Sequence, residues 1–334
     1  MNYTNEELKQ KIKSLKEKLD VTIVAHFYQK DEVYEMADIV GDSLELAIKT
    51  KEDKSEFIVF CGVGFMGQSV KVLAPSKRVV MPKVSECSMA RMIDSSFFDD
   101  NIKFLEEKGI SKEQILPITY INSDANIKAK VGEMGGMVCT SANAKKIITT
   151  ALKEGKKIFF VPDRCLGQNI ANEMGLKSMV IGLNDMDPKE ADIICYDGFC
   201  AVHQLFSIED IEFYRKKYPG IKIAVHPECD PEICKRADFV GSTSQLIKYI
   251  TQELDPEDKV AVGTEYNMVN RLRPKNTYIL SSTKPECPTM NETTLEDLYL
   301  TLKSIEEGKP LNEIEVDEKT VKWAKIALER MLEL

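Results

Sequence analysis

The sequence predicts an α/β protein built from one strand–helix pattern that occurs three times. Short apolar runs rich in β-branched residues alternate with helix-length stretches along the 334 residues, as they do in parallel sheets with crossover helices. The runs fall into three sets of four that follow the same order. Because the chain also exceeds the length that one hydrophobic core usually serves, we expect several domains.

The four runs of each set are interpreted as successive strands, each with the turn that follows it. The first set begins at Val21 (VTIVAHFYQ), Ala37 (ADIVGDSLELA), Glu56 (EFIVFCGVGFMG) and Lys77 (KRVVMPKVSEC). The second begins at Gln114 (QILPITYIN), Gly135 (GGMVCTSANA), Lys156 (KKIFFVPDRCLG) and Ala191 (ADIICYDGFC). The third begins at Ile221 (IKIAVHPEC), Ala237 (ADFVGSTSQLI), Lys259 (KVAVGTEYNM) and Asn276 (NTYILSSTKPEC). The sets predict domains at 1–105 with an N-terminal helix, at 106–205, and at 206–334 with C-terminal helices.

Three kinds of side chain recur at matched places in the three sets. Each set has a polar or aromatic residue at the end of its first strand, a hydroxyl at the following helix start and a cysteine at the end of its fourth strand: His26, Ser43 and Cys87; Tyr120, Ser141 and Cys200; His226, Thr243 and Cys287. The two intervals are 17 and 44 residues in both the first and the third set, and 21 and 59 in the second. Loops tolerate such insertions, so the middle set still fits.

All these positions are expected at the carboxyl ends of strands, where open α/β sheets bind their ligands. Three such edges that face one another would enclose a single central site. The alternative for the hydroxyls is that they are only helix N-caps, a role that Ser and Thr commonly take. Their recurrence at matched positions favours a functional role.

The nine cysteines are odd in number and dispersed, which indicates reduced thiols that bind metal or are simply buried. Three thiolates from three strand ends would hold a [4Fe-4S] cluster with one iron free as a Lewis acid. Cys61, Cys139 and Cys195 lie within predicted strands and fit simple burial. The remaining three lack counterparts in the other sets and rank below the repeat-related cysteines: Cys165, Cys229 and Cys234.

The histidines add groups that can transfer protons near neutral pH. The chain has only three, and two of them, His26 and His226, occupy equivalent positions at first-strand ends. Glu228 lies two residues beyond His226, on the same side of an extended segment, and is a candidate general acid or base.

Composition narrows the classes of partner and location. The net charge of −9 argues against a nucleic-acid-binding surface. The sequence contains no run of eighteen apolar residues, the length that would predict a membrane span. The N-terminal stretch is charged and unlike a signal peptide, so we expect a cytoplasmic protein. Gly62, Gly64 and Gly67 match a dinucleotide fingerprint, but they follow a third strand, so we assign them to strand–helix packing instead.

The chain resembles the quinolinate synthase family from about residue 20 to residue 300. The stretches that carry the resemblance are VAHFYQ, ADIVGDSLELA, YINSDANIKAK, VCTSANA, DGFCAVH, HPECDPEI, ADFVGSTSQLI, VGTE and ECPTMN. The resemblance implies three Rossmann-like domains, each a three-layer αβα unit with a parallel sheet, in a pseudo-threefold arrangement. It also implies one [4Fe-4S] cluster per chain, held by Cys87, Cys200 and Cys287.

The resemblance further implies a reaction and roles for individual side chains. Iminoaspartate would condense with dihydroxyacetone phosphate to give quinolinate, phosphate and water for NAD biosynthesis, with an aspartate-oxidising enzyme as a candidate supplier of iminoaspartate. The implied substrate-binding residues are His26, Ser43, Tyr120, Asn122, Ser141, His226, Glu228 and Thr243. The implied catalytic residues are Tyr28, Tyr120, His226 and Glu228, with Tyr28 and Glu228 in proton transfers.

Some positions depart from the family's usual pattern, and two other functions stay open. Gly64 and Gly67 stand where other residues are commoner, Cys165 replaces a commoner asparagine, and the glycine-rich stretch from Val131 to Met137 is interpreted as a candidate flap over the site. The first alternative is a hydro-lyase that uses the open iron. The second is a non-enzymatic redox sensor or binding protein that carries a cluster.

Overall fold

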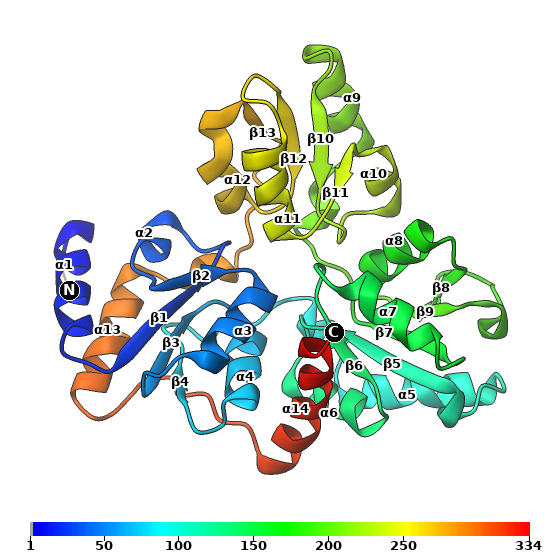
Figure 1. Ribbon diagram of the computed structural model, residues 1–334, viewed down its shortest axis with the longest axis horizontal. Helices are drawn as coiled ribbons and strands as arrows, with labels where there is room; N and C mark the ends of the chain where they lie inside the picture. The colour runs from blue at the N-terminus through cyan, green and yellow to red at the C-terminus, as the bar shows by residue number, and fades with distance from the viewer. Residues whose placement is uncertain (1–2) are drawn as a thin grey trace.

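The computed structural model describes residues 3–334, which fold into three parallel sheets arranged around a common centre (Figure 1). The first sheet has the order β2-β1-β3-β4 and the third has the equivalent order β11-β10-β12-β13. The middle sheet, β6-β5-β7-β9-β8, keeps this order and adds β8 at its edge. Helices flank each sheet, so the predicted α/β class with three Rossmann-like αβα domains is confirmed.

The first domain contains these elements: β1 (Val21–His26), α2 (Asp31–Tyr34), β2 (Ile39–Gly41), α3 (Ser43–Glu52), β3 (Phe57–Cys61), α4 (Gly64–Leu73) and β4 (Arg78–Val80). The second contains β5 (Ile115–Tyr120), α6 (Ala125–Glu133), β6 (Met137–Cys139), α7 (Ala144–Leu152), β7 (Lys157–Val161), α8 (Arg164–Met174), β8 (Ser178–Val180) and β9 (Ile193–Cys195). The third contains α9 (Ile208–Lys217), β10 (Lys222–Val225), α10 (Pro231–Arg236), β11 (Phe239–Val240), α11 (Thr243–Lys248), β12 (Val260–Gly263), α12 (Tyr266–Leu272) and β13 (Thr277–Ile279).

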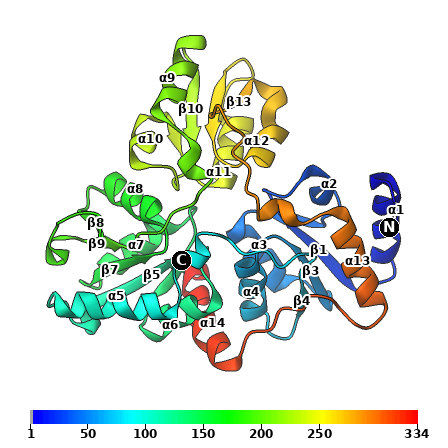
Figure 2. The same ribbon diagram turned by 180° about the vertical axis from the view of Figure 1, so that it is seen from behind.

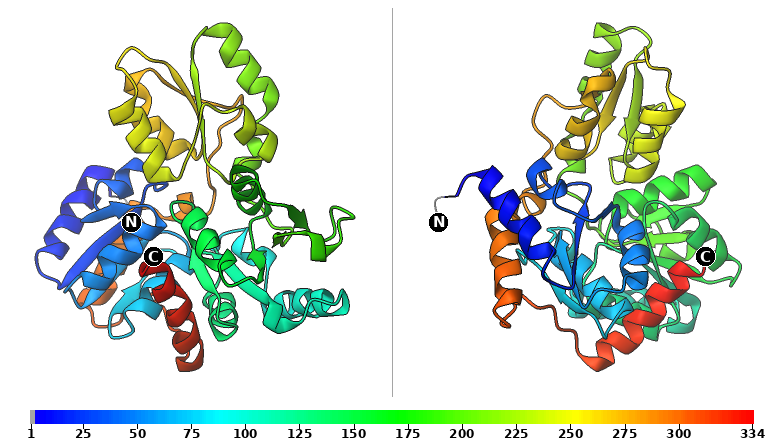
Figure 3. Two further views of the ribbon diagram at one scale, coloured as in Figure 1. Left: turned by 45° about the vertical axis from the view of Figure 1, so that its right-hand side comes forward. Right: turned by 60° about the vertical axis from the view of Figure 1, so that its left-hand side comes forward.

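The strand order explains why one end of each sheet can hold a site. In each sheet the first strand lies between the second and the third, with parallel registers such as Val21 to Phe57 and Lys222 to Val260. The crossovers from the first and second strands therefore leave in opposite directions, and a crevice opens between the loops that follow the first and third strands. In Figure 3 these carboxyl ends face the middle of the molecule in all three domains.

Four helices outside the repeat pack on the first and second domains: α1 (Asn5–Lys16), α5 (Ser95–Glu107), α13 (Leu295–Glu306) and α14 (Glu318–Leu332). Seen from behind, α13 lies beside α1 on the first domain, whereas α14 packs against α6 and β6 of the second (Figure 2). Phe98 of α5 packs against Phe159 of the second sheet. The sequence placed α5 largely with the first domain and both C-terminal helices with the third, so this helix packing was not predicted, while the domain limits stay a prediction.

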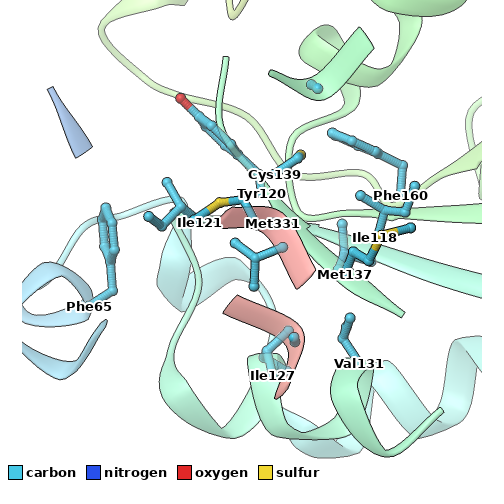
Figure 4. Close-up of a cluster of buried hydrophobic side chains, with 14 of the residues drawn as sticks. Phe65, Ile118, Tyr120, Ile121, Ile127, Val131, Met137, Cys139, Phe160 and Met331 are labelled. Carbon is cyan, nitrogen blue, oxygen red and sulfur yellow. The ribbon is translucent and has the colours of Figure 1, made fainter. Parts of the chain in front are cut away.

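Buried side chains form one core that the first two domains share, a separate cluster of the first domain beneath α1 and α13, and separate clusters for the third domain. The shared core runs from Phe60 in the first sheet to Ile118 and Phe159 in the second. In the third sheet, Ile223 and Ala224 belong to clusters on opposite faces. The segment from Val131 to Met137 joins α6 to β6 and buries Val131 and Met137 in the shared core beside α14 (Figure 4), so the interpretation as a flap over the site was wrong.

Within the described residues, we find no helix that combines the length and the apolar character needed to cross a membrane.

Candidate active site

One cavity at the centre of the three domains is lined by every side chain that the sequence singled out as a site residue. These are His26, Tyr28, Ser43, Cys87, Tyr120, Asn122, Ser141, Cys200, His226, Glu228, Thr243 and Cys287. The cavity has no lysine or arginine among its lining residues within the described chain. Its polar groups are therefore neutral donors, thiols and carboxyl groups.

The carboxyl end of each first strand contributes a matched pair of lining residues, and in the second domain Ile121 lines the cavity as well. His26 and Tyr120 are the last residues of β1 and β5, and His226 directly follows β10. The second residue beyond each of these also lines the cavity: Tyr28, Asn122 and Glu228. The repeat therefore extends two positions further than the sequence comparison indicated.

The hydroxyl residues line the cavity but are not the helix caps. Asp42 caps α3 by accepting from the backbone N–H groups of Leu44 and Glu45, and Ser242 caps α11. Ser43 and Thr243, the first residues of these helices, are thereby free to present their hydroxyls. The interpretation of these hydroxyls as simple N-caps is wrong for both.

The three cysteines lie on loops beyond the fourth strands, and the expectation that they end those strands was wrong. The strands β4, β9 and β13 end at Val80, Cys195 and Ile279, several residues before the lining thiols. After β4, Pro82 has no N–H group with which to continue a ladder. The chain is therefore free to turn inward, toward the centre.

The same main-chain hydrogen bond anchors each cysteine loop. The first residue of the helix that follows each third strand donates its N–H to the carbonyl two positions before the cysteine: Gly64 to Ser85 at 2.8 Å, Arg164 to Gly198 at 2.9 Å, and Tyr266 to Pro285 at 2.9 Å. A short 3₁₀ helix then begins three residues after each cysteine: Ala90–Met92, His203–Leu205 and Met290–Glu292. The pseudo-threefold relation thus includes the backbone that carries the thiols.

The thiol environment fits a metal cluster better than it fits three free thiols. Burial raises the pKa of Cys87 to about 12 and also raises the pKa of Cys200 and Cys287. Cys287 also raises the pKa of Cys87, and both of these thiols raise the pKa of Cys200, whereas the N–H of the third residue after each cysteine lowers the pKa of that cysteine. Bound iron would remove the burial penalty by supplying positive charge, and N–H groups directed at sulfur are typical of iron–sulfur sites.

A smaller donor set overlaps this site. Cys200, His203 and Glu228 place their ligand atoms within 4.8 Å of one another, and no other trio of Cys, His, Asp or Glu side chains does so in the described chain. This set includes Cys200 but neither Cys87 nor Cys287.

Two residues that the sequence reasoning left without a role complete a polar network around Glu228. His203 Nδ1 lies 3.1 Å from Glu228 Oε2, although it is not aligned as a hydrogen bond, and His203 Nε2 lies 3.1 Å from the hydroxyl of Thr264. Tyr120 donates its hydroxyl to Glu228 Oε1 at 2.5 Å. His203 begins the short helix after Cys200, and Thr264 follows a third strand, so the repeat held a positional signal for both.

Tyr28 joins this network from the first domain. Its hydroxyl lies 3.1 Å from the Thr243 hydroxyl and 3.0 Å from that of Thr264. Burial and the nearby charge of Glu228 raise the pKa of Tyr28, and of Tyr120, well above the usual value. Both phenols are therefore protonated donors at neutral pH. Figure 4 shows the ring of Tyr120 among apolar side chains with its hydroxyl directed away from them.

Two cavity histidines are neutral and share one tautomer. Burial lowers the pKa of His26 to about 4 and that of His226 to about 3. Each Nδ1 accepts the backbone N–H two residues on, from Tyr28 at 3.1 Å and from Glu228 at 3.3 Å. Each Nε2 therefore carries the hydrogen, and that of His226 lies 3.2 Å from Ser141 Oγ.

The carboxyl of Glu228 is held ionised against its burial. Burial raises the pKa, but the two neighbouring imidazoles and the Tyr120 hydroxyl outweigh it, so the pKa of Glu228 lies below the usual value. The site thus combines the carboxyl groups of Asp42 and Glu228 with neutral donors from three domains.

The cysteines and glycines ranked lower by sequence lie outside the cavity lining. Cys229 is buried with its thiol 3.5 Å from the Gly263 carbonyl, and neither Cys165 nor Cys234 lines the cavity. A Cβ at Gly62 would meet Phe60 at 2.7 Å, and one at Gly67 would meet Met81 at 2.6 Å. Tight packing therefore accounts for these two glycines.

The comparisons with known proteins agree over nearly the whole chain. The family model described as "Quinolinate synthetase A protein" matches residues 10–333. A protein named quinolinate synthase from Helicobacter pylori (strain HPAG1) is 55% identical over 336 residues, which cover 99% of each chain. Those from Streptomyces coelicolor and Listeria innocua are 39% and 41% identical, covering 98% and 99% of this chain and 88% and 94% of their own. The chain belongs to the quinolinate synthetase A protein family of enzymes.

Proposed function

We propose that the chain condenses iminoaspartate with dihydroxyacetone phosphate and dehydrates the product to quinolinate, for NAD biosynthesis in the cytoplasm. The observation that carries this proposal is the convergence of twelve singled-out side chains, from three domains, on one central cavity. An aspartate-oxidising enzyme is the proposed supplier of iminoaspartate.

Cys87, Cys200 and Cys287 are the proposed ligands of a [4Fe-4S] cluster. When bound, such a cluster supplies a Lewis acid through the iron that has no thiolate. The three thiols come from three domains, so they hold the group only when all three domains are assembled. The anchored loops keep each thiol in place before iron arrives.

Neutral donors are proposed to bind the anionic substrates. The Nε2–H groups of His26 and His226 and the amide of Asn122 offer hydrogen bonds to carboxylate or phosphate oxygens. The hydroxyls of Ser43, Ser141 and Thr243 add three more donors. Because lysine and arginine are absent from the described lining, recognition rests on hydrogen bonds from neutral groups.

Glu228, His203 and Thr264 are proposed to move a proton to and from Tyr28. A hydroxyl, an imidazole and a carboxylate in this order are the arrangement with which hydrolases activate a hydroxyl. Here Tyr28 Oη lies 3.0 Å from the Thr264 hydroxyl and also lines the cavity. Tyr28 thus carries the proton at the substrate, while Glu228 stabilises the charge that forms on His203.

A hydro-lyase with a single metal ion is the second candidate, favoured by the trio of Cys200, His203 and Glu228. The two candidates differ in the side chains on which the metal depends. A cluster needs Cys87 and Cys287, whereas a single ion held by the trio does not. The two also differ in product, because only the condensation gives a pyridine ring.

The test compares cysteine variants purified without oxygen. Wild type should contain about four irons and four sulfides per chain, and Cys87→Ser, Cys200→Ser and Cys287→Ser should each lose iron and quinolinate formation, because a serine hydroxyl replaces thiolate poorly. Cys229→Ser is the matched control and should keep both. A Cys287→Ser variant that kept iron, or iron-free wild type that made quinolinate, would overturn the cluster proposal.

A further inference from the structure

Each of the three loops that carry Tyr28, Asn122 and Glu228 is held by a side chain that donates to two backbone carbonyls. The two carbonyls belong to the residues immediately before and after the functional one. Arg271 donates to the carbonyls of Phe27 and Gln29, Lys128 to those of Ile121 and Ser123, and Asn169 to those of Pro227 and Cys229. We call these three side chains the clamps.

The clamp on Glu228 is the best defined of the three. Asn169 Nδ2 lies 2.8 Å from the Pro227 carbonyl and 2.8 Å from the Cys229 carbonyl, so both amide hydrogens are used. Asn169 is half-buried on α8 of the second domain, whereas Glu228 belongs to the third. The hydrogen bonds therefore cross between domains and fix the peptide groups on both sides of the carboxylate.

Arg271 has the same place in the repeat as Asn169. Each is the fifth residue after the one whose N–H anchors a cysteine loop, counting from Arg164 and from Tyr266. Arg271 lies on α12 of the third domain and reaches the first, where NH1 lies 3.0 Å from the Gln29 carbonyl. The same group also bonds to Asp31 at 2.8 Å. In two domains, therefore, the helix that follows the third strand holds the loop that follows the first strand of another domain.

A third contact links the first domain to the second, but here the side chain accepts a hydrogen bond instead of donating to two carbonyls. Gln68, on α4 of the first domain, accepts the N–H of Ala125 in the second domain at 2.9 Å, just beyond the loop of Asn122. Lys128, from within the second domain, supplies the donors to the loop carbonyls. Domain one thus contacts domain two, two contacts three, and three contacts one.

We propose that Asn169 and Arg271 are positioning residues that hold Glu228 and Tyr28 in reacting geometry. The proposal rests on the proposed function only in taking these two side chains as reacting groups. A carbonyl left without a donor in this setting turns toward another partner, and the side chain between two such peptides turns with it. Because the clamps Asn169 and Arg271 both cross between domains, domain assembly and side-chain orientation depend on the same bonds.

The experiment replaces Asn169 with near-isosteric residues that cannot donate. Asn169→Asp and Asn169→Leu should lower kcat per loaded cluster about tenfold to a hundredfold and change KM less than about threefold, because misplacement by about 1 Å acts on the reacting geometry. Iron content should equal that of wild type. Amide hydrogen exchange at residues 226–230 should become about tenfold faster, because the loop opens more readily.

Asn312→Asp is the matched control, because Asn312 Nδ2 also donates to two carbonyls, those of Met81 at 3.2 Å and Pro82 at 3.5 Å, outside the cavity lining. It should keep wild-type kcat. Arg271→Gln should repeat the kcat loss with faster exchange at residues 27–31, while Arg330→Gln, which removes a donor to the distant Gly136 carbonyl, should not.

Unchanged kcat in both Asn169 variants, or an equal loss in Asn312→Asp, would overturn the proposal. If Asn169→Asp does not fold because of its added charge, Asn169→Leu gives the same comparison without that charge. The exchange measurement does not depend on turnover. If wild type makes no quinolinate, the proposed function fails, while the exchange of residues 226–230 still decides whether Asn169 holds the loop.

Discussion

Lys128 is a fully buried lysine in the wall between the first and second domains. Its ammonium donates to the carbonyls of Ile121 and Ser123 and lies 5.3 Å from the centre of the Phe65 ring. Burial lowers the pKa of Lys128 to about 7, and the charge of Asp124 offsets part of that effect. The lysine thus holds the loop of Asn122 while losing its proton far more readily than a lysine in water.

Lys128 should make stability depend on pH in the alkaline range. Between about pH 7 and pH 10.5 the unfolded chain binds more protons at this residue than the folded chain, so the unfolding free energy rises with pH, by at most about 1.4 kcal/mol per pH unit. Below about pH 7 the burial penalty is fully present. Urea denaturation measures this effect in wild type and in Lys128→Met. The unfolding free energy of wild type minus that of Lys128→Met should rise with pH across this range. A difference that stays flat would contradict the lowered pKa.

The sequence repeat allowed some site residues to be predicted and gave no indication of others. The twelve lining residues that the sequence singled out were found because matched intervals and family motifs mark their positions. His203 and Thr264 lie within the motifs DGFCAVH and VGTE, but the sequence indicated no role for their side chains, because their partners are a carboxylate and a hydroxyl distant in sequence. The clamps could not be predicted either. They bond to backbone carbonyls, which every residue has, so the sequence of the loop does not reveal the contact.

At the scale of elements, the crossing of α6 and α14 depends on one missing side chain. A Cβ on Gly132 of α6 would lie 2.1 Å from the Trp323 carbonyl oxygen on α14. The obstacle is backbone, which cannot rotate aside as a side chain can. Glycine therefore allows the two helices to approach closely at a position where alanine would favour the isolated helix.

Gly132→Ala should destabilise the protein even though alanine is the better helix former. In an exposed helix this change would stabilise by about 1 kcal/mol, but here overpacking should reverse the sign and lower the unfolding free energy by about 1–3 kcal/mol. Thermal and urea denaturation measure the effect. Gly132→Ser should behave in the same way, and an unchanged melting temperature would show that α14 shifts without loss.

The sequence predicted strand–helix alternation well and helix docking poorly. Apolar runs such as Phe57–Cys61 are buried on both faces, which is why they stand out along the chain. The docking sites of α13 and α14 could not be predicted in this way, since an amphipathic helix shows that it covers an apolar surface without showing which one. The loops after β4 and β13 had the same limitation, because strand length depends on neighbours.

For the whole molecule, the C-terminal helix acts as part of the second domain. It buries Ala324, Ala327, Leu328 and Met331 against α6, β6 and α4. The strand β6 leads toward Ser141, and α6 follows the loop of Asn122, so both elements beneath α14 support the cavity. The chain end is therefore structurally coupled to a site that it does not touch.

A stop after Glu315, which removes α14, should lower the unfolding free energy by about 3–6 kcal/mol through the exposure of apolar surface. The truncated protein should also lose bound iron faster during gel filtration, because the second domain then supports the Cys200 loop less firmly. A stop after Leu332, which keeps α14 whole, is the control. Equal stability and equal iron retention in the two truncations would show that α14 is dispensable.

The anchored cysteine loops have a consequence for the order of events during synthesis. Cys87 and Cys287 are 200 residues apart, so at about 5–20 residues per second the ribosome makes the first about 10–40 s before the last. Each loop is fastened to its own domain by a main-chain hydrogen bond, so a thiol can be set in place as soon as its domain folds. The proposed three-cysteine site is therefore complete only after translation has passed Cys287, when the thiols of Cys87 and Cys200 can already be in place.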